Sequence, residues 1–124
     1  MAPRILIIED DPLQLAVFSD LLRITGHDTD PAGSLAEALS RLSGEPPDVI
    51  LLDMSLRDGS GADFFTQARA CEAWAKVPVI VCTGHLDAEV QWKRDCSEWD
   101  ALRILSKPFG LDELRAEIRA ALRG

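Results

Sequence analysis

Three short apolar runs are the strongest structural signal in the chain: Ile5–Ile8, Val49–Leu52 and Val79–Cys82. None of them alternates with polar residues, and β-branched side chains are frequent among them. Such runs are typical of parallel strands whose two faces are both covered by helices. Two weaker segments, near His27–Pro31 and Arg103–Ser106, predict further strands and bring the expected sheet to five.

Amphipathic segments lie between the apolar runs. Apolar residues recur at helical spacing in three places: at Leu15, Phe18 and Leu22, at Leu35, Leu39 and Leu42, and at Leu111, Leu114, Ile118 and Leu122. Gly26 and Gly44 are expected to end the first two helices. Ser34 is expected to cap the second helix, with Glu37 completing a capping box.

The alternation of strand and helix predicts an α/β fold. We expect a doubly wound, flavodoxin-like parallel sheet of five strands in the order 2-1-3-4-5, with about five helices. The segment from His85 to Asp100 gives the least defined pattern, although Trp92 and Trp99 fit a helix there.

Composition narrows the functional classes. The chain has 124 residues, of which 47% are hydrophobic, as expected for one globular domain. Its net charge of −8 repels phosphate backbones and anionic lipid. No apolar run approaches the roughly 20 residues of a membrane span, and Ile5–Ile8 is too short for a signal peptide. Cys71, Cys82 and Cys96 form no CxxC pair and are expected to be reduced thiols. These features predict a cytoplasmic protein that itself binds neither nucleic acid nor membrane.

Polar residues follow the ends of four predicted strands: Glu9, Asp10 and Asp11 the first, then Asp53, Thr83 and Lys107. In an open α/β sheet, ligands bind outside the carboxyl ends of the strands, where the strand order reverses. Because neighbouring strands are about 4.8 Å apart, we expect Asp10 and Asp53 to share one cation. Thr83 needs only its short hydroxyl to reach this point, whereas Lys107, roughly 10 Å away, has the long side chain required.

The crowding of carboxylates predicts a metal ion. At about 4 Å and an effective dielectric near 20, each like-charged pair costs on the order of 4 kcal/mol, so folding alone does not favour it. Oxygen ligands suit Mg²⁺, or alternatively Mn²⁺, rather than zinc. The cation, Lys107 and the Thr83 hydroxyl would neutralise a phosphoryl group, and Asp53 would be the nucleophile that accepts it.

Each of these residues alone also has an ordinary structural interpretation. Asp11 is expected to be a helix N-cap before Pro12. Asp53 is compatible with a loop acid, Thr83 with a strand-end hydroxyl and Lys107 with a surface charge. Their joint occurrence at four strand ends favours the functional interpretation.

Five segments, taken in order, carry a family resemblance: Ile7–Pro12, Leu51–Leu56, Asp58–Gly61, Val79–Gly84 and Ser106–Phe109. Over essentially the whole chain they resemble the receiver domains of two-component response regulators. The resemblance implies a single receiver domain over residues 1–124, whose Asp53 accepts a phosphoryl group from a histidine kinase or histidine phosphotransfer protein. Phosphorylation would switch a surface for a downstream effector, an output domain or a second copy of the chain. The domain would catalyse only its own phosphorylation and dephosphorylation.

The resemblance also implies roles for individual residues. Glu9, Asp10, Asp53 and the backbone carbonyl of Ser55 would hold Mg²⁺. Thr83 and Lys107 would contact the phosphate, and the Lys107–Pro108 peptide would be cis.

Several positions depart from the family pattern, including the stretch Ser97–Asp100, which lacks the Gly-Ala pair common before the last strand. Arg57 stands where a proline is usual, and Ile104 stands where Tyr or Phe is common. Because isoleucine cannot make the inward swing of an aromatic ring, we expect a different output coupling. Trp92 and Trp99 are expected to pack in the core, with a partner-binding face as the alternative. The stripe formed by Arg115, Arg119 and Arg123 is expected to be solvated.

Three other functions remain to be separated from this one. A metal-dependent aspartyl phosphohydrolase of the haloacid dehalogenase type would carry an acid at position 55, where this chain has Ser55. In a flavodoxin-like flavin module, Glu9, Asp10 and Asp11 would repel the flavin phosphate. A receiver-like interaction module that is never phosphorylated is disfavoured because the acceptor, acid, threonine and lysine positions are all retained.

Overall fold

The computed structural model describes residues 2–53, 55–83, 102–106 and 109–123. Its elements are, in chain order, β1 (Arg4–Ile8), α1 (Pro12–Ile24), β2 (Asp28–Ala32), α2 (Leu35–Ser40), the 3₁₀ helix η1 (Arg41–Ser43), β3 (Val49–Asp53), β4 (Ser55–Leu56), β5 (Gly59–Ser60), α3 (Gly61–Ala70), β6 (Val79–Thr83), β7 (Leu102–Ser106) and α5 (Leu111–Arg123). The five long strands form one parallel sheet in the order β2-β1-β3-β6-β7. Counted along the chain, this is the predicted order 2-1-3-4-5. β4 and β5 form a separate antiparallel hairpin.

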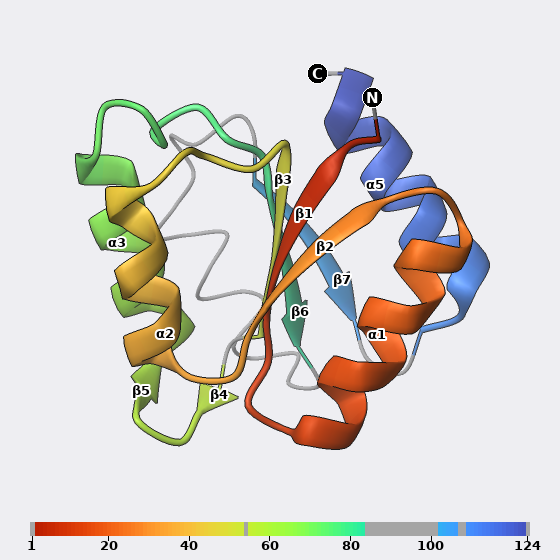
Figure 1. Cartoon of the computed structure of the whole chain (residues 1–124), viewed down its shortest axis with the longest axis horizontal. Helices are drawn as coiled ribbons and strands as arrows, with labels where there is room; N and C mark the ends of the chain where they lie inside the picture. The colour runs from red at the N-terminus through yellow and green to blue at the C-terminus, as the bar shows by residue number, and fades with distance from the viewer. Residues whose placement is uncertain (1, 54, 84–101, 107–108, 124) are drawn as a thin grey trace.

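Helices cover both faces of the sheet, α2 and α3 on one side and α1 and α5 on the other (Figure 1). Successive residues of one strand therefore enter different cores. In β1, Leu6 and Ile8 pack in the cluster that includes α2 and α3 side chains, whereas Ile5 and Ile7 pack in the cluster that includes α1 and α5 side chains. This two-sided burial explains why the strand sequences are apolar throughout instead of alternating.

Helix α1 begins as its sequence predicts. The Asp11 carboxylate accepts hydrogen bonds from the backbone N–H groups of Leu13 (2.9 Å) and Gln14 (3.4 Å), and Pro12 occupies the first turn. Leu22 is buried in the core, and Gly26 follows the helix with a φ of 94°. The predicted roles of Asp11 as cap and Gly26 as terminator are confirmed.

The second predicted helix is shorter than its apolar spacing indicates. Helix α2 ends at Ser40, and Leu42 lies in η1. The Ser34 hydroxyl caps α2 by accepting from the N–H of Glu37 at 3.0 Å. The predicted capping box is wrong in its second half, because the Glu37 carboxylate accepts from the N–H of Gly33 (2.9 Å).

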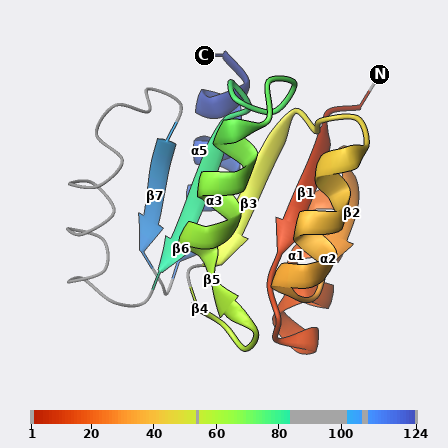
Figure 2. The same ribbon diagram turned by 90° about the vertical axis from the view of Figure 1, so that its left-hand side faces the viewer.

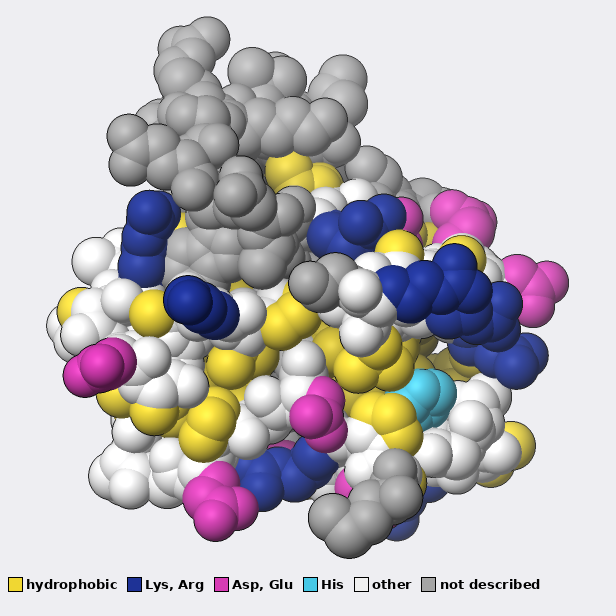
Figure 3. All heavy atoms as spheres, turned by 90° about the horizontal axis from the view of Figure 1, so that it is seen from above, with side chains coloured by type: hydrophobic (Ala, Val, Ile, Leu, Met, Phe, Trp, Pro, Cys, Tyr) yellow, Lys and Arg dark blue, Asp and Glu magenta, His cyan; other side chains and the backbone are white. Residues whose placement is uncertain are grey.

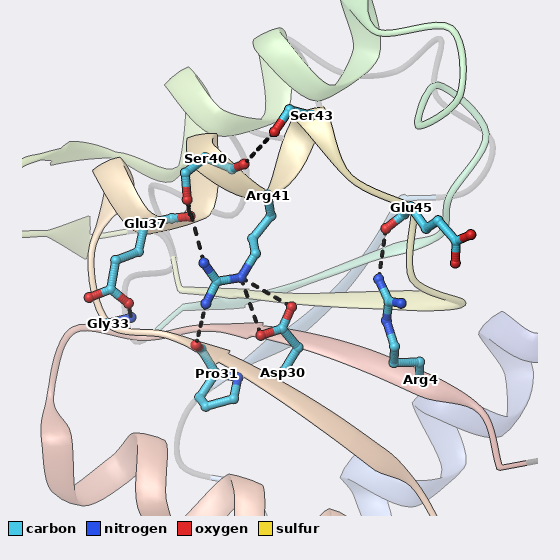
Figure 4. A network of polar contacts seen from close by, with 9 residues as sticks. All are labelled: Arg4, Asp30, Pro31, Gly33, Glu37, Ser40, Arg41, Ser43 and Glu45. Atoms are coloured by element: carbon cyan, nitrogen blue, oxygen red, sulfur yellow. Dashed lines mark hydrogen bonds and ion pairs between the residues drawn. The ribbon is translucent and has the colours of Figure 1, made fainter.

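A polar network fastens the end of α2 to β2, the edge strand of the sheet (Figure 4). Arg41 Nε donates to both carboxylate oxygens of Asp30, at 3.2 and 3.1 Å, and Arg41 Nη2 donates to the carbonyl of Pro31 at 3.1 Å. Since a proline has no N–H for a sheet ladder, its place in an edge strand is the ordinary one. The network holds η1 against this edge.

Helices α3 and α5 differ from the sequence predictions. Helix α3 was not predicted; it begins with a capping box between Ser60 and Asp63 and buries Phe64, Phe65 and Ala68. In α5, Leu114, Ile118 and Ala121 are buried, whereas Leu122 is 40% exposed, so its predicted place on the apolar face is wrong. The buried face follows the 114, 118, 121 spacing, and Leu122 lies beyond its border.

The described residues contain four α-helices and one 3₁₀ helix. The fifth helix predicted between His85 and Asp100, with Trp92, Trp99 and Cys96, lies outside the described residues. Of the described helices, none combines the length and the apolarity needed to cross a bilayer.

The remaining described side chains agree with the sequence predictions. Within the described part of the chain Cys71 and Cys82 form no disulfide, and Cys82 is buried in the core. Arg115, Arg119 and Arg123 are exposed on α5. Figure 3, seen from the end of the molecule where the termini lie, shows Lys and Arg side chains gathered on the side of α5.

Candidate metal and phosphoacceptor site

The carboxyl ends of the central strands lie side by side at one end of the sheet, next to the β4–β5 hairpin (Figure 1). Ile8 of β1 pairs with Leu52 of β3, so the residues that follow them, Glu9 and Asp53, leave the sheet at the same level. Asp53 in turn pairs with Cys82 of β6. The acids that were far apart in sequence are therefore neighbours because of strand register.

Three carboxylates form a cluster at this edge. Glu9, Asp10 and Asp53 each offer one oxygen, and these oxygens all lie within 4.8 Å of one another. Glu9 is buried, at 3% exposure, while Asp10 and Asp53 are half-buried. Burial of an ionised carboxylate beside two others is unfavourable unless positive charge or hydrogen-bond donors compensate it.

Backbone donors supply part of that compensation. The N–H of Asp11 donates to Glu9 Oε1 at 3.2 Å, and the N–H of Arg57 donates to Asp10 Oδ2 at 2.6 Å. The Arg57 guanidinium lies farther away, with Nε 3.9 Å from Asp10 Oδ2, and its side chain is largely exposed. The two backbone hydrogen bonds restrain the orientation of the Glu9 and Asp10 carboxylates, which belong to the cluster.

Asp11 does not belong to the cluster, although it is adjacent in sequence. Its side chain is turned to the N-terminus of α1, where it accepts from Leu13 and Gln14. The run of three acids thus divides into one helix cap, Asp11, and two members of the cluster.

The donor set fits a small hard divalent cation. Two ligands on opposite sides of Mg²⁺, each at about 2.1 Å, are separated by about 4.2 Å. Adjacent ligands of such an ion lie about 3.0 Å apart, so the three oxygens, all within 4.8 Å of one another, are near enough to be drawn together around one octahedral ion. Carboxylate oxygens without Cys or His ligands favour Mg²⁺ or Mn²⁺ over zinc.

The other residues predicted for the site lie on β4 and β6 or outside the described residues. Thr83 is the last residue of β6, one position beyond the partner of Asp53, and its backbone pairs with Ser106 of β7. Ser55 begins β4, two residues after Asp53. Lys107 and Pro108 lie outside the described residues, as does the predicted cis peptide between them. Ile104, at the position where an aromatic residue is common, is half-buried and packs against the α2–α3 side of the core.

The sequence analysis did not predict that Asp58 caps helix α2, close to this end of the sheet. The Asp58 carboxylate accepts from the backbone N–H groups of Leu35 (2.8 Å) and Ala36 (3.0 Å), at the start of α2. These hydrogen bonds hold the pKa of Asp58 below its ordinary value of 3.8, and the one from Leu35 has the larger effect. No local spacing signals this cap, because 22 residues separate Asp58 from Ala36.

Comparison with known proteins identifies the family. Residues 5–119 match the family model for the response regulator receiver domain, and the chain belongs to this family. Receiver domains of response regulators are signalling domains. Among curated proteins, the chain is 35% identical over 119 residues to the transcriptional regulatory protein KdpE of Mycobacterium tuberculosis, covering 96% of this chain and 50% of that protein. It is 38% identical over 124 residues to the KDP operon transcriptional regulatory protein KdpE of Escherichia coli, covering 96% and 51%. The chain thus spans about half the length of these relatives.

Solved structures agree on the fold. The receiver domain of a sensor histidine kinase from Pseudomonas aeruginosa has a TM-score of 0.86 and 26% identity, covers 100% of both chains, and was crystallised with a magnesium ion coordinated in its active-site cleft. A chemotaxis protein of the CheY type from Vibrio cholerae has a TM-score of 0.88 at 22% identity, covering 98% of this chain and 100% of the other, which supports the fold alone. The predicted fold class and family are confirmed.

Proposed function

We propose that this domain accepts a phosphoryl group on Asp53 in a reaction that requires Mg²⁺ or Mn²⁺. One observation carries the proposal: Glu9, Asp10 and Asp53, at the carboxyl ends of two neighbouring strands, present oxygens within 4.8 Å of one another although Glu9 is buried. A cluster of this kind is destabilising in the absence of a cation and becomes favourable when one binds. The magnesium ion in the cleft of the related kinase receiver domain supports the same interpretation.

The residues divide the work as follows. Glu9, Asp10 and Asp53, with the Ser55 carbonyl, would hold the cation, which would supply positive charge next to the phosphoryl oxygens. A carboxylate oxygen of Asp53 attacks the phosphorus of a phosphohistidine, so that an O–P bond forms and the N–P bond breaks, with the electron pair leaving on the imidazole nitrogen. Thr83 and Lys107 contact the transferred phosphoryl group.

The biological setting follows from this chemistry. The phosphoryl donor is a histidine kinase or a histidine phosphotransfer protein, and the receiver switches a surface for an output domain, a separate effector or a second copy of the chain. Residues 1–124 form one receiver domain that turns over no dedicated substrate and acts in the cytoplasm. Two relatives of about twice this length are named transcriptional regulatory proteins, which supports an output domain as the partner. The acidic receiver itself contacts neither nucleic acid nor membrane.

Intact-protein mass spectrometry tests the proposal. With acetyl phosphate and Mg²⁺, the wild-type protein should gain one phosphoryl group, and chelation of the metal should prevent this. Asp53→Asn should abolish the gain. Asp11→Asn is the matched control, because it makes the same chemical change beside the cluster and asparagine caps a helix equally well. Unchanged labelling of Asp53→Asn would overturn the assignment.

A further inference from the structure

The β4–β5 hairpin joins the acidic cluster to α2 through adjacent residues. Ser55 pairs with Ser60 and Leu56 with Gly59, so Arg57 and Asp58 form the turn between the two strands. The N–H of Arg57 donates to Asp10 Oδ2 at 2.6 Å. The carboxylate of Asp58 accepts from the first two N–H groups of α2 at 2.8 and 3.0 Å. Figures 1 and 2 both show this hairpin at the end of the sheet where α2 begins.

Close packing makes the hairpin contact with α2 specific. Leu56 and Leu35 are both buried in the core cluster on this face of the sheet. Gly59 has a φ of 156°, and a Cβ atom added there would overlap Leu35 Cδ2. The turn therefore touches α2 through a charge-assisted pair of hydrogen bonds and through apolar contact, and it cannot shift along the helix without losing both.

We propose that Asp58 is a positioning residue for the acidic cluster: by anchoring the hairpin turn to the N-terminus of α2, it raises the affinity of Glu9, Asp10 and Asp53 for a divalent cation. This inference rests on the proposed function of the cluster as a metal site. Asp58 itself touches neither the cluster nor the metal.

Asp58 can affect cation affinity because the hairpin that it anchors also contacts the cluster. The Arg57 N–H donates to Asp10 Oδ2 and thereby restrains the orientation of the Asp10 carboxylate, which is a member of the cluster. Ser55, whose carbonyl is a proposed ligand, lies in the same hairpin. Without the anchor, the turn gains conformational freedom that it must lose again when the cation binds. Partners that orient metal ligands typically change affinity by about tenfold or more.

Thermodynamic linkage makes the coupling reciprocal. If the anchor improves Mg²⁺ binding by about tenfold, bound Mg²⁺ must stabilise the anchored turn by the same factor. Amide hydrogen exchange at Leu35 and Ala36, whose N–H groups Asp58 holds, should therefore slow in the wild-type protein when Mg²⁺ is added. This measurement needs no substitution and is independent of any loss of stability in a variant.

The decisive experiment compares two caps of the same helix. Asp58→Ala removes the cap that reaches from the hairpin, whereas Ser34→Ala removes the local cap, in which the Ser34 hydroxyl accepts from Glu37. Both should lower the melting temperature. By calorimetric titration with Mg²⁺ alone, Asp58→Ala should bind about tenfold more weakly. Asp58→Asn, which keeps one acceptor oxygen, should be intermediate, and Ser34→Ala should match the wild type.

Two sets of results would overturn the inference. Equal Mg²⁺ affinity of Asp58→Ala and the wild type, or an equal loss in Ser34→Ala, would show that Asp58 acts only as a structural cap. Unchanged amide exchange at Leu35 and Ala36 would contradict the reciprocal effect. If the wild-type protein itself bound no Mg²⁺, the proposed metal site would fail and this inference with it, which is a distinct outcome.

Discussion

The contact between Gly59 and Leu35 allows a quantitative test of how the hairpin packs. Gly59→Ala adds a methyl group at a φ of 156° and against Leu35 Cδ2, in a side chain that is 8% exposed. The unfavourable φ costs about 1–2 kcal/mol and overpacking a further 1–3 kcal/mol, which gives about 2–5 kcal/mol together. Leu35→Val shortens the opposing side chain at a cost of about 1 kcal/mol. The free energy of unfolding can be measured by urea titration with tryptophan fluorescence, to which the buried Trp74 contributes.

A double-mutant cycle separates the two contributions. Since Leu35→Val gives the added methyl group room, the double variant should be more stable than the sum of the single changes by about 1–2 kcal/mol. Gly26→Ala is the matched control, because Gly26 has a φ of 94° and no atom lies within 4 Å of an added Cβ. It should cost about 1–2 kcal/mol and combine additively with Leu35→Val. Additive behaviour of Gly59→Ala would refute the packing argument.

Two further predictions concern single polar groups. Ser19 is 5% exposed, and its hydroxyl has no hydrogen-bond partner within the described part of the chain. Ser19→Ala should therefore leave the free energy of unfolding in urea unchanged or raise it by about 1 kcal/mol. A loss of more than about 1 kcal/mol would contradict this. Asp58 has a pKa below 3.8 in the folded state, so wild type should exceed Asp58→Asn in stability above about pH 5, and this advantage should shrink as the pH falls through the depressed pKa. A difference that grew on acidification would disprove the stated cause.

The fold was predictable where burial is uniform. The runs around Ile5–Ile8, Val49–Leu52 and Val79–Cys82 are apolar on both faces, as expected for a parallel sheet covered by helices on both sides. Helix α3 was missed although the sequence carries its signals: Phe64, Phe65 and Ala68 recur at helical spacing, and Ser60 and Asp63 form a capping box. Boundaries were less predictable, because Leu42 and Leu122 fit the helical spacing but lie in η1 and at the surface.

The candidate site was predictable to the extent that it depends on strand ends. Glu9, Asp10 and Asp53 follow apolar runs that pair in register, so their convergence follows from topology. The roles of Arg57 and Asp58 were not predictable, because each makes its contact with a residue more than 20 positions away. Such contacts depend on how a two-residue turn is oriented, and periodicity carries no information about that.

The most direct test of the account is the location of Mn²⁺ by anomalous diffraction from crystals of the wild-type protein. Mn²⁺ accepts the same oxygen ligands as Mg²⁺ and can be identified by its scattering. One ion should be bound by carboxylate oxygens of Glu9, Asp10 and Asp53, and it should be lost or markedly weakened in Asp53→Asn. An ion bound elsewhere, or none among these three carboxylates at saturating Mn²⁺, would contradict it.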